Sequence, residues 1–189
     1  MARSGKALPR LLFFTDPART LDIEAAAATL PVGAAIVFRA FGAADAEERG
    51  RALARFARAR GLKLLVGADD RLAARIGADG VHLPERLAWR ARAVRHRGTG
   101  WIVTAAAHSA RAAMTALGDG ADAVVVSAAF ASASPSAGAP MGPTRLAALA
   151  RQVGGPVYAL GGINEQTARR LKDAGLAGLA AVDGLAPRT

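Results

Sequence analysis

Two adjacent glycines, Gly161 and Gly162, follow the apolar run "PVYAL" and precede a stretch of helical periodicity that begins near Asn164. Because glycine has no side chain, its backbone amide can approach an anion closely, and the amino-terminal end of a helix favours negative charge. This junction could therefore bind a phosphate group. The structural alternative is that the glycines only turn the chain while Asn164 caps the helix.

A single arginine, Arg39, interrupts the apolar run "AIVFRAF" near its carboxyl end. Its planar guanidinium matches phosphate or diphosphate oxygens, which makes it a candidate clamp for such a group. It could equally pair with a carboxylate at the end of a neighbouring strand, such as Asp16. Both interpretations stay open, and both can hold in the ligand-free protein.

Two histidines are candidate acid–base groups. His82 and His108 each follow an apolar segment and could act as general acid, general base or hydrogen-bond donor. The alternative for both is a structural histidine whose ring is satisfied by a neighbour. No serine, histidine and aspartate set typical of nucleophilic catalysis is discernible. The sequence has no cysteine, so thiolate chemistry, disulfides and cysteine-bound metals are excluded.

Adjacent aspartates, Asp69 and Asp70, are candidate ligands of Mg²⁺, with Glu85 as a third acidic group. Carboxylate oxygens are the ligands that magnesium prefers. The aspartate pair also opens a stretch of helical periodicity, where carboxylates cap the first amides and interact favourably with the helix dipole. The sequence leaves both roles open.

These groups are carried by a chain that alternates short apolar runs with amphipathic stretches rich in alanine, leucine and arginine. Strands that are apolar on both faces, each followed by a helix, are typical of a parallel sheet covered by helices. The predicted strands span residues 11–16, 35–40, 63–68, 80–83, 101–107, 123–128, 156–162 and 176–184. The predicted helices lie near 22–30, 44–60, 69–76, 85–97, 109–118, 143–153 and 164–174.

About eight such units predict a TIM-type (β/α)8 barrel, formed by residues 1–189 as a single domain. The alternative is an open doubly wound sheet, but "FFTDPART" stands where the phosphate loop "GxGxxG" would follow its first strand. Only "LAPRT" follows the last predicted strand, so we expect a barrel without its last helix. A partner chain could bury the flank left uncovered, which makes a homodimer a hypothesis.

In a parallel barrel, functional groups sit at the carboxyl ends of the strands, and phosphate sites often form from the loops after the seventh and eighth strands. The glycine pair follows the seventh predicted strand and Asp183 follows the eighth. This arrangement favours a phosphorylated small molecule as ligand, although the Asp183 carboxylate would repel it. After the sixth strand, the segment 128–143, rich in serine, glycine and proline, is a candidate lid, with a plain loop as the alternative.

The net charge of +10 invites a nucleic-acid interpretation. Most of this charge comes from arginines at helical spacing, as in "ERGRALARFARARG", which is typical of a solvated helix face. Aromatic residues are too sparse to stack on bases, so we do not expect nucleic acid as a partner. No stretch reaches the roughly 18 apolar residues of a membrane helix, and no leader pattern opens the sequence, so we expect a cytoplasmic protein.

Several segments, in this order, resemble the thiamine phosphate synthase family and its relatives, the TenI-type thiazole tautomerases. They are "LLFFTDP", "VFRAF", "RLAARIGADGVHLPE", "TAAAHSARAA", "GDGADAVVVSAAFASASPS", "PMGPTRLAALA" and "PVYALGGINEQTARRLKDAGLAGLAAV", of which "GADGVHL" and "ALGGI" are the most specific. The resemblance implies a (β/α)8 barrel that joins an aminopyrimidine diphosphate to a thiazole phosphate, with Mg²⁺ assisting the departure of diphosphate.

Carried over residue by residue, the resemblance implies catalytic roles for Arg39 and His108 and a thiazole-phosphate site at Gly161, Gly162 and Val182. Other positions depart from the family pattern. Metal ligands of the family are among the residues lost, unless Asp69 or Asp70 takes their place. Apolar or small residues stand where the family has polar groups: Val37, Phe41, Gly67, Ala68, Leu87, Ala106 and Ala128. Two forms therefore stay open, an active transferase and a non-catalytic or tautomerase-like relative that binds a thiamine intermediate.

Overall fold

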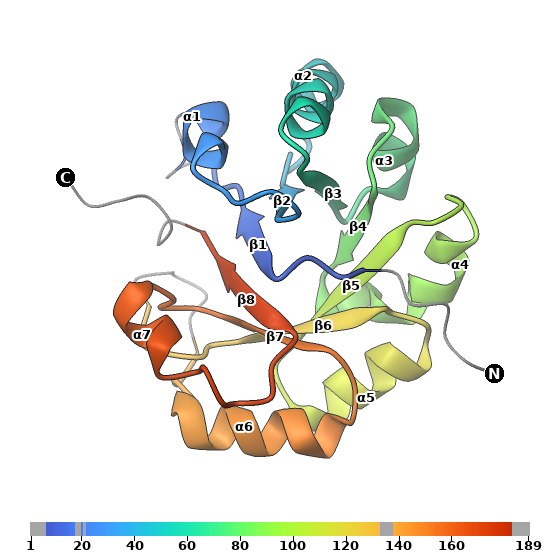
Figure 1. Ribbon diagram of the computed structural model, residues 1–189. Helices are drawn as coiled ribbons and strands as arrows, with labels where there is room; N and C mark the ends of the chain where they lie inside the picture. Colours follow the sequence, from blue (N-terminus) through green and yellow to red (C-terminus); the bar gives the residue numbers. More distant parts are fainter. Residues whose placement is uncertain (1–6, 18–19, 21, 133–137, 183–189) are drawn as a thin grey trace.

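Eight parallel strands close into a barrel in the computed structural model, which describes residues 7–17, 20, 22–132 and 138–182. Each strand pairs with the next along the chain, and β8 pairs with β1. The described helices form a ring outside the strands (Figure 1). The strands are β1 (Leu11–Phe14), β2 (Ala35–Phe38), β3 (Lys63–Gly67), β4 (Gly80–Leu83), β5 (Ile102–Ala107), β6 (Ala123–Ser127), β7 (Val157–Leu160) and β8 (Gly178–Ala181). The predicted (β/α)8 barrel is confirmed.

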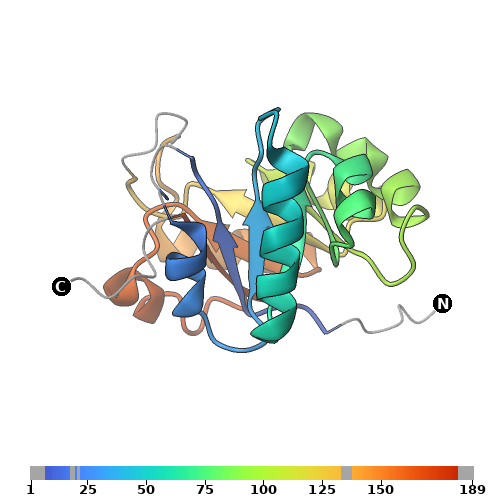
Figure 2. The same cartoon turned by 90° about the horizontal axis from the view of Figure 1, so that it is seen from above.

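A helical segment follows each strand from β1 to β7, and Figure 2 shows α1 and α2 standing alongside the barrel wall. The helices are α1 (Ile23–Ala28), α2 (Ala46–Ala59), α3 (Asp70–Ile76), the 3-10 helix η1 (Glu85–Arg90), α4 (Ala91–Arg95), α5 (Ala110–Gly118), α6 (Gly142–Val153) and α7 (Glu165–Arg169). The single helix predicted over 85–97 is therefore a 3-10 helix followed by a short α-helix. The helix predicted over 164–174 stops at Arg169, because the following amides bond three residues back, as Leu171 does to Ala168.

Alternating side chains divide the barrel wall into an inner and an outer face. The inner face holds an apolar cluster of Leu12, Phe14, Ala35, Val37, Leu65, Ile102, Ala123, Val125, Tyr158 and Ala180. The intervening residues of the same strands, such as Ile36 and Val124, pack outward in the larger cluster between strands and helices. Both faces are buried, which is the reason why the strands read as continuous apolar runs.

Several predictions about the ends and the long loop fall partly outside the described residues. Residues 183–189, where a last helix would lie, are among those not described, as are 133–137 of the candidate lid. The single-domain, homodimer and lid predictions therefore stay predictions. Within the described ranges, no helix combines the length and apolar character needed to cross a bilayer.

Candidate functional site

All eight strands point the same way, so their carboxyl ends meet at one end of the barrel, here called the mouth. Arg39 follows β2, and the Gly161–Gly162 turn follows β7. His82 lies within β4, one residue before its end. The mouth therefore collects an arginine, a histidine and a glycine pair that are far apart in the sequence.

Arg39 is held by β1 as it reaches the mouth. Its backbone amide donates to Thr15 Oγ1 at 3.0 Å, and its side-chain Nε donates to Thr15 O at 2.6 Å. A terminal guanidinium nitrogen lies 3.3 Å from Asp16 Oδ2. The predicted pairing of Arg39 with Asp16 is confirmed, whereas its role as a phosphate clamp stays a prediction.

Two aromatic rings lie close to the Arg39 guanidinium. Its Cζ lies 5.8 Å from the centre of the Phe14 ring and 5.3 Å from that of Phe41. Phe14 in turn makes a T-shaped contact with the His82 ring, with 4.8 Å between the ring centres. We call His82, Phe14, Arg39 and Phe41 the Arg39 column. It runs from a buried histidine to the exposed Phe41 ring.

His82 is a buried, neutral member of this column. The residue is 8% exposed, and its Nδ1 lies 2.9 Å from Thr104 Oγ1. Burial, with a smaller contribution from the positive charge of Arg39, lowers the pKa of His82 to about 3. Its ring is therefore uncharged at neutral pH and can offer a ligand only neutral hydrogen bonds. The structural interpretation of His82, a ring satisfied by a neighbour, fits this geometry.

His108 lies after β5 and contacts a different part of the molecule. Its Nδ1 lies 2.7 Å from Glu85 Oε2, the oxygen that also accepts the His108 backbone amide at 2.7 Å. The side chain is 61% exposed. This contact joins the β5 end to the start of η1, while the Arg39 column is built from β1, β2 and β4. A catalytic role for His108 stays a prediction.

The Gly161–Gly162 turn adopts a backbone that favours glycine, with φ of +101° and +62°. The loop after β6 packs directly against it, since Ala129 N donates to Leu160 O at 2.8 Å and Phe130 N to Gly161 O at 3.0 Å. A Cβ on Gly162 would lie 2.3 Å from a backbone oxygen of that loop, Ala131 O. Close packing alone therefore requires glycine here, and phosphate binding stays a prediction.

Asn164 caps the short α7, as the structural alternative for this junction predicts. Its side chain accepts from Thr167 N at 2.9 Å, and Thr167 Oγ1 accepts from Asn164 N at 2.9 Å. Val182 follows β8 and is the described residue on that side of the predicted phosphate site. It is half-buried and packs against the apolar cluster inside the barrel. Asp183 lies outside the described residues.

The aspartate pair is engaged by the protein itself. Asp69 Oδ1 accepts from Leu72 N at 2.8 Å, so Asp69 is the cap of α3. Asp70 is 4% exposed, and its two carboxylate oxygens face Arg90 at 3.1 Å and Arg97 at 2.8 Å. Over the described ranges, no three histidine, aspartate or glutamate side chains gather as a metal site would require. Both carboxylates thus have partners within the protein, and magnesium binding by them stays a prediction.

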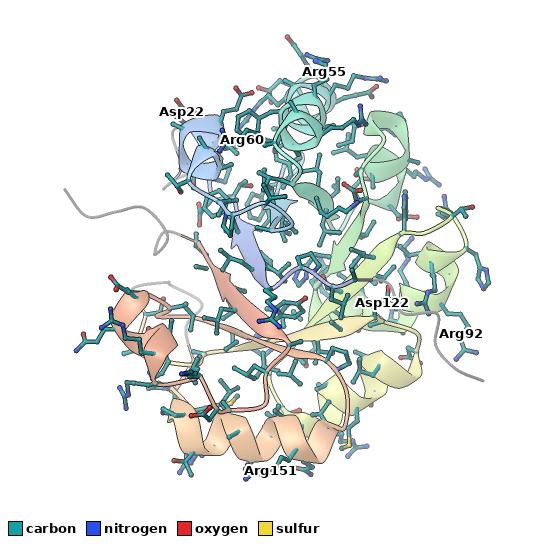
Figure 3. The ribbon with its side chains drawn as sticks, viewed as in Figure 1. Asp22, Arg55, Arg60, Arg92, Asp122 and Arg151 are labelled. Carbon is teal, nitrogen blue, oxygen red and sulfur yellow. The ribbon has the colours of Figure 1, made fainter. Side chains whose placement is uncertain are left out.

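The basic side chains are spread around the barrel. Figure 3 shows Arg55 on α2, Arg92 on α4 and Arg151 on α6 lying on different sides of the molecule. Others are offset by carboxylates, as in the pair of Arg51 with Glu47. This spread fits the solvated helix faces predicted from the arginine spacing.

Sequence reasoning gave no role in the site to three residues of the mouth: Phe14, Phe41 and Thr104. The first two touch Arg39, and Thr104 orients His82. Phe14 and Thr104 lie within predicted strands, whereas Phe41 lies after β2 in a turn that hydrophobic periodicity does not mark.

The sequence model of a family described as thiamine monophosphate synthase matches residues 11–185. A thiamine-phosphate synthase of Chromobacterium violaceum is 37% identical over 178 residues, 90% of this chain and 83% of that protein. A putative thiamine-phosphate synthase of Geobacter sulfurreducens is 34% identical over 139 residues, 73% of this chain and 65% of that protein. The chain spans 58–65% of the length of the Geobacter protein and of three other relatives.

Solved structures share the fold. Thiamine phosphate pyrophosphorylase from Pyrococcus furiosus superposes with a TM-score of 0.76 at 24% identity, covering 93% of this chain and 86% of that chain. A structure described as native KDPGal superposes with a TM-score of 0.66 at 21% identity, covering 95% and 84% of the two chains. At this level of identity, the likeness establishes the barrel architecture alone.

Proposed function

The chain belongs to the thiamine monophosphate synthase family, and on that premise we propose that its mouth binds a phosphorylated thiazole- or pyrimidine-type small molecule of thiamine biosynthesis. One observation carries this proposal: Arg39 and the Gly161–Gly162 turn, which come from β2 and β7, lie at the same end of the barrel. A cation and exposed backbone at one barrel end are a common basis for binding a phosphorylated ligand.

The phosphate group would bind at the Gly161–Gly162 turn, next to Val182. Both glycines are partly exposed although the β6 loop packs against them. Neither glycine has a side chain of its own, so phosphate oxygens could approach the backbone amides within hydrogen-bond distance. The phosphate end of the ligand is therefore recognised by the main chain.

The rest of the ligand would extend across the mouth toward Arg39. The side chains of Arg39 and Asp16 are 27% and 26% exposed, so a ligand can reach both. Asp16 offsets part of the guanidinium charge, and neutral His82 adds none. This side of the mouth is therefore less positive than the presence of an arginine alone would indicate.

The more specific form of the function is a transferase that joins an aminopyrimidine diphosphate to a thiazole phosphate. The alternative is a non-catalytic or tautomerase-like relative that binds one thiamine intermediate. The described carboxylates favour the second form, because Asp69 caps a helix and Asp70 pairs with Arg90 and Arg97. The function that the geometry supports best is therefore binding of the phosphorylated thiazole.

A two-part experiment separates these forms. The purified protein is incubated with both substrates and Mg²⁺, and thiamine phosphate is measured by chromatography. In parallel, the melting temperature is measured with thiazole phosphate. Product establishes the transferase, whereas stabilisation without product establishes the binding form. The absence of both results would refute the proposed function.

A further inference from the structure

We propose that Phe41 determines the ligand specificity of the mouth, by stacking its exposed ring on a planar heteroaromatic ring of the ligand. The inference rests on the proposed function and narrows its ligand class. The β2 side of the mouth takes an uncharged aromatic ring, and the ligand carries a single phosphate, which binds at the Gly161–Gly162 turn. A diphosphate is disfavoured on the β2 side.

Phe41 is placed to present one ring face to a ligand. The residue is 71% exposed, although large apolar side chains are ordinarily buried. Arg39 lies against the ring, with 5.3 Å between its Cζ and the ring centre. Behind Arg39, Phe14 and His82 continue the Arg39 column into the barrel. The Phe41 ring is therefore supported from inside and open toward solvent.

The backbone around Arg39 is held in an unusual conformation. Phe41 has φ of +48° and Ala68 has φ of +65°, and within the described ranges these are the non-glycine residues with positive φ. Both flank Arg39, since Ala68 follows Gly67, whose added Cβ would lie 3.2 Å from Arg39 Cγ. Strained backbone of this kind concentrates at ligand-binding sites. Here it directs an aromatic ring outward at the mouth.

The charges around Arg39 suit a ring better than a diphosphate. A diphosphate carries several negative charges and is ordinarily held by several cationic or metal groups. Arg39 already pairs with Asp16 at 3.3 Å. Val37 and Phe41, two residues before and after Arg39 in the sequence, bring no charge. An aromatic ring of the ligand needs no cationic partner. Stacking on Phe41, with the Arg39 guanidinium on the other side of the Phe41 ring, would stabilise its binding.

The test is isothermal titration of the wild type, Phe41→Ala and Phe41→Tyr with thiazole phosphate, inorganic phosphate and inorganic diphosphate. If the rings stack, Phe41→Ala should lower the affinity for thiazole phosphate about tenfold, while Phe41→Tyr should keep the affinity of the wild type. Inorganic phosphate should bind the wild type and Phe41→Ala equally. Val32→Ala, which alters a side chain 84% exposed at the opposite end of β2, is the matched control and should change nothing.

Two results would overturn the inference while leaving the proposed function intact. The first is unchanged binding of thiazole phosphate by Phe41→Ala. The second is wild-type protein that binds inorganic diphosphate more tightly than thiazole phosphate. If the wild type binds neither thiazole phosphate nor inorganic phosphate, the proposed function fails together with the inference. Circular dichroism of each variant establishes that it is folded.

Discussion

Asp16 and Arg39, at the carboxyl ends of neighbouring strands, form an ion pair with 3.3 Å between Oδ2 and a terminal guanidinium nitrogen. In the ligand-free protein the arginine at the mouth is thus already matched by a carboxylate. Any anion that approaches Arg39 must compete with Asp16, whereas an aromatic ring that stacks on Phe41 leaves the pair intact.

Replacing Asp16 should make this side of the mouth more attractive to anions. Asp16→Asn removes the competing charge, so the affinity for inorganic diphosphate should rise about two- to fivefold, the range typical of a partly exposed pair. Titration calorimetry measures the change. Asp45→Asn, which removes the exposed partner of Arg49 on α2, is the control and should have no effect. Equal affinities for Asp16→Asn and wild type would contradict this account of Arg39.

His82 should make stability depend on pH. Its pKa of about 3 in the folded protein lies below the ordinary 6.5, so the unfolded chain binds a proton that the folded protein does not. The stabilisation is complete above about pH 6.5 and is lost as pH falls toward 3. Between pH 7 and pH 5 the free energy of unfolding should fall by about 2 kcal/mol more in wild type than in His82→Gln.

Urea unfolding of both proteins at the two pH values measures this difference. The imidazole carbon-bound proton signals give an independent check, because those of His82 should not titrate between pH 7 and pH 5. Equal losses of stability in the two proteins would mean that the pKa of His82 is not lowered by folding, so that its ring is protonated in the folded protein at pH 5.

The Gly161–Gly162 turn should tolerate no side chain at Gly162. Gly162→Ala places a Cβ 2.3 Å from Ala131 O at φ of +62°, so we expect a loss of about 2 kcal/mol or more in unfolding free energy. Gly138→Ala is a control in the same β6–α6 segment, because nothing lies within 4 Å of its added Cβ. Denaturant unfolding compares the two. Similar stabilities would mean that the loop does not pack on the turn as described.

The aspartate pair should act on stability alone. Asp69→Ala removes the cap of α3 and should cost about 1 kcal/mol. Asp70→Asn replaces the buried carboxylate that pairs with Arg90 and Arg97 by a neutral amide. It should cost more unfolding free energy, about 3 kcal/mol. Both losses should be the same in EDTA and in excess Mg²⁺. A loss that appears only with magnesium present would assign these carboxylates to a metal.

The barrel could be predicted from the sequence because a physical pattern encodes it. Runs such as Val124 to Val126 are apolar at successive positions, as strands buried on both faces require. Helix signals were equally direct at Gly77 and Gly154, which end α3 and α6 in the left-handed conformation. The early end of α7 was not visible, because a switch to bonds three residues back leaves no mark in hydrophobic periodicity.

The Arg39 column could be predicted only in part. The pairing of Arg39 with Asp16 was among the alternatives, since both residues end predicted strands. The contacts of Phe14, His82 and Phe41 depend on the register of β1, β2 and β4, which the sequence does not state. The positive φ of Phe41 is also hidden, because phenylalanine rarely adopts it. The requirement for Gly162 likewise arises from a loop some 30 residues earlier in the sequence.

The central claim, that the mouth binds a phosphorylated ring through the Gly161–Gly162 turn, is tested most directly by nuclear magnetic resonance. The amide signals of isotope-labelled protein are followed during titration with thiazole phosphate. We predict saturable shifts at Gly161, Gly162 and Val182, with inorganic phosphate shifting the same amides and only the thiazole compound shifting Phe41. Saturable shifts confined to another surface, or none at these residues up to millimolar ligand, would contradict the claim.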